Sequence, residues 1–244
     1  MPSHPRQLSF KEPPTWGGRR AGAGRKPGPQ PRVLHRARPV HRPRHPAHVT
    51  LCARPGVASL RAPNVYPLVE QAIAAAARPD GRVVQFSVQG EHVHLIVEAT
   101  DERALSSLVR RVSIRAARAV NRLLARRGPL WDGRYHRHDL TTPRETRNAL
   151  VYVLANWRKH RDRAAGLDPC SSARWFDGWR EARPNAGVAE SGGQARPPVC
   201  RARTWLLTVG WRRGGLLATD EAPRPATERA ARRQRARSRR ARAR

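Results

Sequence analysis

Two consecutive apolar segments joined by a tight connection constrain the fold of this chain more than any other feature. Residues 82–89 (RVVQFSVQ) and 92–99 (HVHLIVEA) are rich in β-branched side chains, and only Gly90 and Glu91 separate them. This pattern predicts two antiparallel strands that form a β-hairpin. We therefore expect a sheet in which residues 92–99 form a central strand.

Alternating and helical patterns on both sides of the hairpin predict the rest of the domain. Asp101 is suited to cap a long helix, and Thr142-Pro143-Arg144-Glu145 is a capping box that opens another. The remaining predicted elements are a strand at 48–55, a helix at 67–77, a helix at about 102–127, an edge strand at 134–140 and a helix that ends near 160. The order β-α-β-β-α-β predicts an α+β fold of the ferredoxin-like split βαβ type with an added C-terminal helix.

Both ends of the chain are strongly basic. Lys and Arg total 49 against 18 Asp and Glu, which gives a formal net charge of +31. Residues 1–47 contain ten prolines and one acid, and nine of the sixteen residues from 229 to 244 are arginine. Such segments bury too little apolar surface to fold, so we expect disordered basic tails that contact a polyanion, and nucleic acid is the common one. The predicted organisation is a basic arm at 1–47, a catalytic domain at 48–162, a small helical extension with a linker at 163–217 and an Arg-rich tail at 218–244.

The sequence gives no sign of a membrane or secreted location. It contains no apolar run long enough for a transmembrane helix and no apolar core of a signal peptide. Cys52, Cys170 and Cys200 are far apart and fit no zinc or disulfide pattern. We expect a cytoplasmic protein associated with the nucleoid.

A His-Val-His sequence on the central strand is a candidate metal site. His92 and His94 project from the same face of a strand, while Val93 faces the opposite way. Two neutral imidazoles form half of a divalent metal site, although such a pair is more often a set of hydrogen-bonded histidines. The pair at His136 and His138 has the same spacing, but it flanks an arginine, which does not suit a core. We therefore interpret His136 and His138 as edge-strand histidines.

One tyrosine on the last predicted helix is a candidate site residue. Tyr152 and Asn156 are neighbours at i and i+4, beside the apolar face of the helix. For a tyrosine considered alone, half-burial at the core boundary is the simpler interpretation. A helix that crosses the open face of the sheet would instead bring the Asn156 amide and the Tyr152 phenol to the two histidines.

Several basic and aromatic side chains are candidates for nucleic-acid contact. The arginines of the long helix form a stripe that is either a solvated face or a phosphate track. Trp131 is suited to stack on an unpaired base, although packing in the core is its more common use. The candidate residues are Arg111, Arg115, Arg118, Arg122, Trp131 and Arg134.

Together these segments resemble the HUH single-tyrosine transposases, and more closely the REP-associated tyrosine transposases of the IS200-like type. QGEHVHLIVEA resembles the metal-binding strand of that family, and ALVYVLAN resembles its nucleophile helix. HVTLCARP and LWDGRYH also fit, and the resemblance covers roughly residues 45–160. It implies that His92, His94 and Asn156 bind a divalent metal, Mg²⁺ or Mn²⁺, and that Tyr152 is the nucleophile.

The resemblance also implies an activity and a substrate. The protein would bind single-stranded or hairpin DNA, then cleave and rejoin it through a covalent phosphotyrosine intermediate. A homodimer is left open, as is whether the nucleophile helix serves its own chain or a partner. Two alternatives remain: a nucleic-acid-binding module on the same fold, and a decayed transposase that binds DNA without cutting it.

Overall fold

The computed structural model describes residues 39–155, 166–181 and 197–221. From Val40 onward the described residues belong to one compact unit. Residues 39–47, which the sequence assigns to the basic arm, include His41, whose side chain is buried with Nε2 3.2 Å from the carbonyl oxygen of Ala99. The rest of the predicted arm and nearly all of the C-terminal tail lie outside the described residues.

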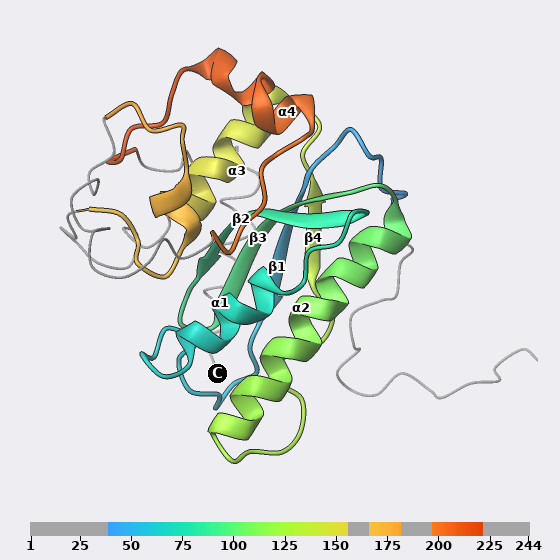
Figure 1. Cartoon of the computed structure of the whole chain (residues 1–244), viewed down its shortest axis with the longest axis vertical. Helices are drawn as coiled ribbons and strands as arrows, with labels where there is room; N and C mark the ends of the chain where they lie inside the picture. Colours follow the sequence, from blue (N-terminus) through green and yellow to red (C-terminus); the bar gives the residue numbers. More distant parts are fainter. Residues whose placement is uncertain (1–38, 156–165, 182–196, 222–244) are drawn as a thin grey trace, which may run out of the picture. The chain divides into compact units, whose positions relative to one another are not determined.

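A four-stranded antiparallel sheet forms the centre of the fold (Figure 1). Its strands, in spatial order, are β2 (Gly81–Val88), β3 (His92–Ala99), β1 (Ala47–Cys52) and β4 (His136–Asp139). The helices are α1 (Tyr66–Ala74), α2 (Glu102–Leu123) and α3 (Pro143–Ala155). This element order confirms the predicted α+β fold of the ferredoxin-like type, with β4 at one edge.

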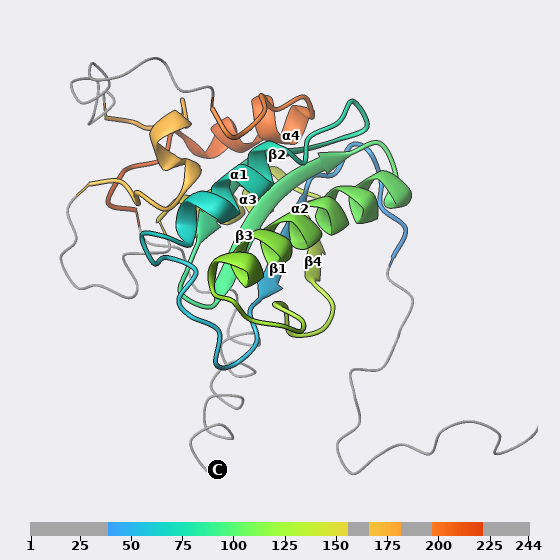
Figure 2. The ribbon, with the colours of Figure 1, turned by 60° about the horizontal axis from the view of Figure 1, so that its bottom comes forward.

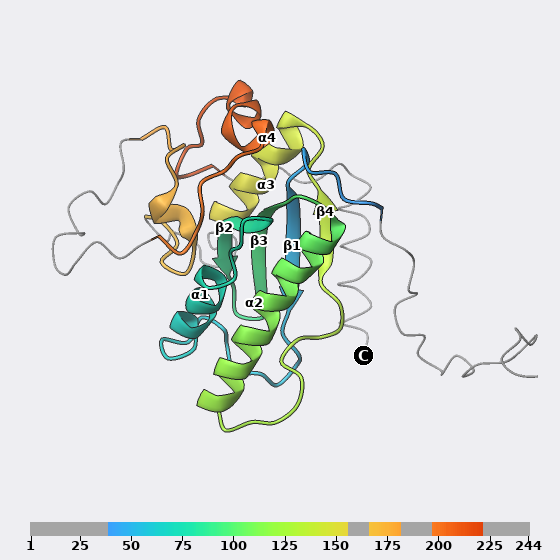
Figure 3. The same cartoon turned by 45° about the vertical axis from the view of Figure 1, so that its right-hand side comes forward.

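Helices α1 and α2 cover one face of the sheet (Figures 1 and 3). Val93, Leu95 and Val97 of β3 point into the apolar core between the sheet and these helices, and all three are fully buried. The alternation of a strand sends their neighbours to the opposite face. In the view of Figure 2, α1 and α2 run alongside each other over the strands.

Helix α3 packs on the opposite face of the sheet. Its buried residues Leu150 and Leu154 contact a second apolar cluster that contains Ile96 of β3 and Trp211 of the C-terminal extension. The predicted capping box begins this helix: the Glu145 N–H donates to the Thr142 hydroxyl at 3.1 Å. Residues 156–160, which were predicted to continue the helix, lie outside the described residues.

The long helix α2 begins as predicted. The Asp101 carboxylate accepts a hydrogen bond of 2.8 Å from the Ala104 N–H, which is the geometry of an N-cap. The cap fixes the start of α2 directly after β3.

The described part of the C-terminal extension contains three short helical segments, which include Trp175, Trp205 and Trp211, whereas Trp179 lies outside them in a β-bridge with Leu217. The segments are η2 (Ser172–Trp175), α4 (Trp205–Thr208) and η3 (Gly210–Gly214). The predicted linker lies mostly outside the described residues. No helix of the described residues is long and apolar enough to cross a membrane.

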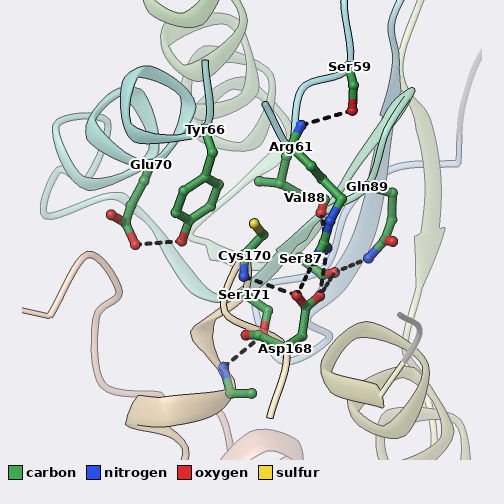
Figure 4. Close-up of polar contacts among 11 residues, drawn as sticks. Ser59, Arg61, Tyr66, Glu70, Ser87, Val88, Gln89, Asp168, Cys170 and Ser171 are labelled. Atoms are coloured by element: carbon green, nitrogen blue, oxygen red, sulfur yellow. Dashed lines mark hydrogen bonds and ion pairs between the residues drawn. The ribbon is translucent and has the colours of Figure 1, made fainter. Parts of the chain in front are cut away.

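The extension is attached to the edge of β2 by a polar cluster (Figure 4). The two guanidinium nitrogens of Arg61 donate to the two carboxylate oxygens of Asp168 at 3.0 and 2.7 Å. The Val88 N–H donates to the Cys170 carbonyl at 2.8 Å, so the extension also bonds to the edge strand through its backbone. These contacts cover one edge of the sheet, which would otherwise expose unpaired backbone groups.

Candidate functional site

His92 and His94 lie on the sheet face that α3 covers. Their rings are nearly parallel, with centroids 6.1 Å apart and planes 9° apart. His94 is buried and His92 is half-buried. The alternation along β3 thus presents both imidazoles to the same side, while Val93 packs into the other core.

Tyr152 reaches this histidine pair from α3. Its ring lies edge-on to the ring of His94, with centroids 5.1 Å apart and planes 84° apart. The side chain is half-buried at the border of the apolar cluster beneath α3. The structure therefore brings together His94 and Tyr152, two predicted site residues from distant parts of the chain, with His92 beside His94. Asn156, the predicted third metal ligand, lies outside the described residues.

A third histidine, His48, completes the group and was missed from the sequence. Its ring centroid lies 5.4 Å from that of His94 and 5.7 Å from that of Tyr152. Its Nε2 atom is buried and has no hydrogen-bond partner within the described ranges. The alternation of HVTLC shows that His48 and Thr50 share a face, but the sequence does not reveal that β1 lies beside β3.

Thr50 orients the central imidazole. It lies opposite His94 in the β1–β3 register, and its hydroxyl shares a hydrogen bond of 3.1 Å with His94 Nδ1. Because this bond engages Nδ1, a ligand of His94 would meet the ring at Nε2. The strand pairing therefore fixes the ring in one orientation.

Burial dominates the electrostatics of this group. It raises the pKa of the Tyr152 phenol above its ordinary value, so the phenol is protonated at neutral pH. Burial, and secondarily the charge of His138, lowers the pKa of His48 to about 4, so this imidazole is neutral. The site as described thus holds a neutral phenol beside a neutral imidazole, and phenolate formation would require added positive charge.

The metal prediction is only partly matched by the residues present. The described ranges contain no group of three His, Cys, Asp or Glu side chains that could hold a metal ion. His92 and His94 offer two imidazoles on one face, and two ligands alone form half of a site. A third ligand must therefore come from another type of side chain or from another part of the chain.

The edge strand β4 differs from expectation in one respect. Arg137 was judged unsuited to a core, yet only 3% of its side chain is exposed. Ion pairs with Glu102 and Asp139 make this burial tolerable, since they compensate the charge. His136 and His138 are exposed, and the register places them opposite Thr50 and His48, on the same sheet face as the candidate site.

The predicted nucleic-acid residues of α2 lie on the other face of the sheet. The Arg111 guanidinium donates to the Ala76 carbonyl at 2.9 Å and to the Ser107 hydroxyl at 2.9 Å, so it joins α2 to the end of α1. Trp131 packs against the core and donates its indole N–H to the Ser113 carbonyl at 3.0 Å. Both side chains are thus engaged within the fold. The others, Arg115, Arg118, Arg122 and Arg134, are exposed.

Comparison with known proteins gives a weak similarity to solved structures. No known protein family and no curated protein matches the sequence. Among solved structures, a REP-associated tyrosine transposase bound to a REP hairpin is similar, with 20% sequence identity. The match covers 51% of this chain and 73% of that chain, with a TM-score of 0.42. A sequence identity and a TM-score this low do not support a conclusion about function.

Proposed function

We propose that this protein is a DNA strand transferase of the transposase type that uses Tyr152 as its nucleophile. The observation that carries the proposal is the contact between the phenol ring of Tyr152, on α3, and the imidazole of His94, on β3. A helix and a central strand thereby bring a nucleophile and potential ligands to one place, which is the arrangement that covalent catalysis requires.

The three tyrosines of the chain differ in a way that singles out Tyr152. The Tyr66 hydroxyl donates to Glu70 at 2.7 Å, and the Tyr135 hydroxyl lies 3.3 Å from that of Ser106 on α2. Neither ring contacts an imidazole in the described part of the chain, whereas Tyr152 contacts two. Tyr152 is therefore the tyrosine best placed for chemistry beside the histidines.

In the proposed reaction the Tyr152 oxygen attacks the phosphorus of a phosphodiester. The phenol loses its proton, the bond from phosphorus to the 3′-oxygen breaks, and the leaving 3′-oxygen takes up a proton. The products are a phosphotyrosine link and a free 3′-hydroxyl. A second 3′-hydroxyl then attacks the link and releases the tyrosine, so no external energy source is needed.

His92 and His94 would hold a divalent metal, Mg²⁺ or Mn²⁺, with Asn156 as the proposed third ligand. When bound, such a metal supplies positive charge that stabilises a non-bridging phosphate oxygen and favours the phenolate. This charge would oppose the effect of burial, which raises the pKa of Tyr152. Thr50 would orient His94 for this role through its bond to Nδ1.

The proposed substrate is DNA in single-stranded or hairpin form. A net charge of +31 suits a polyanionic partner, and a half-buried nucleophile requires a phosphate that can enter the site. Exposed His136 and His138 of β4, on the same sheet face as the site, are suited to contact the DNA backbone, and exposed Arg134 is proposed to do the same. A homodimer, in which α3 serves a partner's site, is compatible with this substrate.

The test is the formation of a covalent adduct. The full chain is incubated with labelled hairpin DNA and Mn²⁺, and protein that retains label after denaturation is measured. We expect an adduct with the natural protein and with Tyr135→Phe, which is the matched control on the opposite sheet face. Tyr152→Phe should form none. Adduct that persists in Tyr152→Phe and disappears in Tyr135→Phe would contradict the assignment.

A second candidate function is nucleic-acid binding without cleavage on the same fold. It is favoured by the raised pKa of Tyr152, which keeps the phenol protonated. The same assay separates the two functions. Tight, salt-sensitive binding to hairpin DNA with no adduct on any single-stranded or hairpin substrate favours this candidate.

A further inference from the structure

Helices α1 and α2 enclose a groove on the sheet face opposite Tyr152. The groove has a volume of about 640 Å³ and is lined by residues of both helices. Figure 3 shows α2 crossing the front of the sheet beside α1, whereas α3 lies behind the strands. The groove is therefore separated from the candidate site by the full thickness of the sheet.

The rim of the groove is strongly cationic. It consists of the exposed arginines Arg110, Arg115, Arg118 and Arg122 of α2. No ion pair joins any of these four to an acidic side chain within the described ranges, and none of the described lining residues is acidic. Four uncompensated cations along one helix raise the local potential and attract an anionic partner.

Apolar side chains also line the groove. Leu68 and Ala72 of α1 and Ile114 of α2 line it, and Ile114 is 43% exposed. Arg111 fixes the distance between the helices through its bond to the Ala76 carbonyl. The groove thus combines apolar lining residues with four exposed cations.

We propose that this groove binds the phosphodiester backbone of a nucleic-acid segment distinct from the one at Tyr152. The twelve residue steps from Arg110 to Arg122 span about 18 Å at about 1.5 Å per residue. That length matches about five phosphates of one DNA strand at about 3.4 Å each. Four guanidiniums over this length can each meet a phosphate, while the described lining residues include none of the aromatic rings that stack on bases.

The consequence is a protein with two nucleic-acid surfaces, one on each side of its sheet. The inference shares the nucleic-acid partner of the proposed function, but it does not depend on cleavage. A segment held in the groove cannot also present its phosphates to Tyr152 without passing around an edge of the sheet. The groove would therefore anchor flanking DNA and leave the site free for the reacting strand.

The first test measures how the affinity for DNA depends on salt. In the full chain, Arg110, Arg115, Arg118 and Arg122 are changed together to Gln. A control variant of equal charge carries Gln at four exposed arginines outside the groove, which are Arg54, Arg103, Arg127 and Arg201. Binding of a labelled duplex and of a labelled single strand is measured between 50 and 200 mM salt.

We expect the groove variant, but not the control variant, to lose much of the salt dependence of its DNA binding. If each arginine meets one phosphate, the slope of log K against log salt falls by up to about 3.6 for duplex or about 2.8 for single strand. For duplex DNA, raising the salt over that range would then lower the affinity of the groove variant about 150-fold less than it lowers the affinity of the natural protein. Equal changes in the two variants would show only a general effect of charge and would overturn the proposal.

The second test locates the DNA without removing charge. A photoreactive side chain replaces Ile114 in the groove lining, and in a control it replaces Val209, which is 53% exposed on the C-terminal extension. Cross-linking to labelled DNA at position 114 but not at 209 supports the groove. If the protein binds DNA but does not cross-link at position 114, the groove proposal is overturned. The proposal is also overturned if the groove variant keeps full DNA affinity and instead loses binding to anionic vesicles. Cross-linking at position 114 without a covalent adduct at Tyr152 contradicts the proposed cleavage and leaves the groove proposal standing.

Discussion

Asp168 attaches the C-terminal extension to the sheet, so its replacement tests how firmly that extension is held. Its side chain is 1% exposed and that of Arg61 is 24% exposed. The pair is joined by two short hydrogen bonds, and Asp168 also accepts from the Cys170 N–H at 3.0 Å (Figure 4). Asp168→Asn keeps the shape of the side chain but removes its charge and turns an amide NH₂ toward the guanidinium.

The expected cost follows from this geometry. Breaking a buried ion pair by changing one partner costs about 3–5 kcal/mol, because a desolvated charge is left alone. Water reaches part of the Arg61 side chain, which lowers the figure, and the amide oxygen still accepts one bond. We therefore expect Asp168→Asn to reduce the free energy of unfolding by about 2–3 kcal/mol.

A double-mutant cycle in urea isolates the pair. Unfolding of Asp168→Asn, Arg61→Met and the double variant is followed by tryptophan fluorescence, and we expect a coupling energy above about 1.5 kcal/mol. The exposed pair of Arg212 and Asp177, 3.4 Å apart, is the control, and its coupling should be near zero. A coupling energy at Arg61–Asp168 as small as that of the control would refute the reasoning.

Two further predictions concern stability. Burial lowers the pKa of His48 from its ordinary value of 6.5 to about 4, so the unfolded chain binds a proton at this residue before the folded chain does. The contribution of His48 to the free energy of unfolding is therefore fully present above pH 6.5 and falls as the pH falls toward 4, with a loss of about 2 kcal/mol at pH 5. In urea titrations His48→Gln should lose this pH dependence, whereas His136→Gln, at an exposed residue, should keep it. Gly178→Ala should destabilise the extension by about 1–3 kcal/mol in the same assay, because the new Cβ would overlap an indole ring, whereas Gly90→Ala, whose Cβ would meet only a serine oxygen at 3.6 Å, should be tolerated.

The local patterns of the sequence predict the elements but not the neighbours of each side chain. The bounds of the strand 92–99 coincide with those of β3, since alternation and β-branched content are properties of consecutive residues. His48 was missed because its role depends on β1 lying beside β3, which is a contact between segments more than forty residues apart. Sequence spacing places Arg111 in the same stripe as Arg115, yet the Ala76 carbonyl that engages it belongs to another segment. Arg137 is tolerated in the interior for the same kind of reason.

The connection between strand β3 and the C-terminal extension has a consequence for biosynthesis. The buried carboxylate of Glu98, on the same face as the histidines, accepts hydrogen bonds from the backbone N–H groups of Arg203 and Thr204. A ribosome that adds about 5–20 residues per second needs about 5–20 s to make the intervening chain. During that interval the Glu98 carboxylate has no partner from the extension, and the apolar cluster around α3 lacks Trp211 and stays open to other nascent proteins. Chains truncated before residue 203 should therefore aggregate even though all four strands have been made.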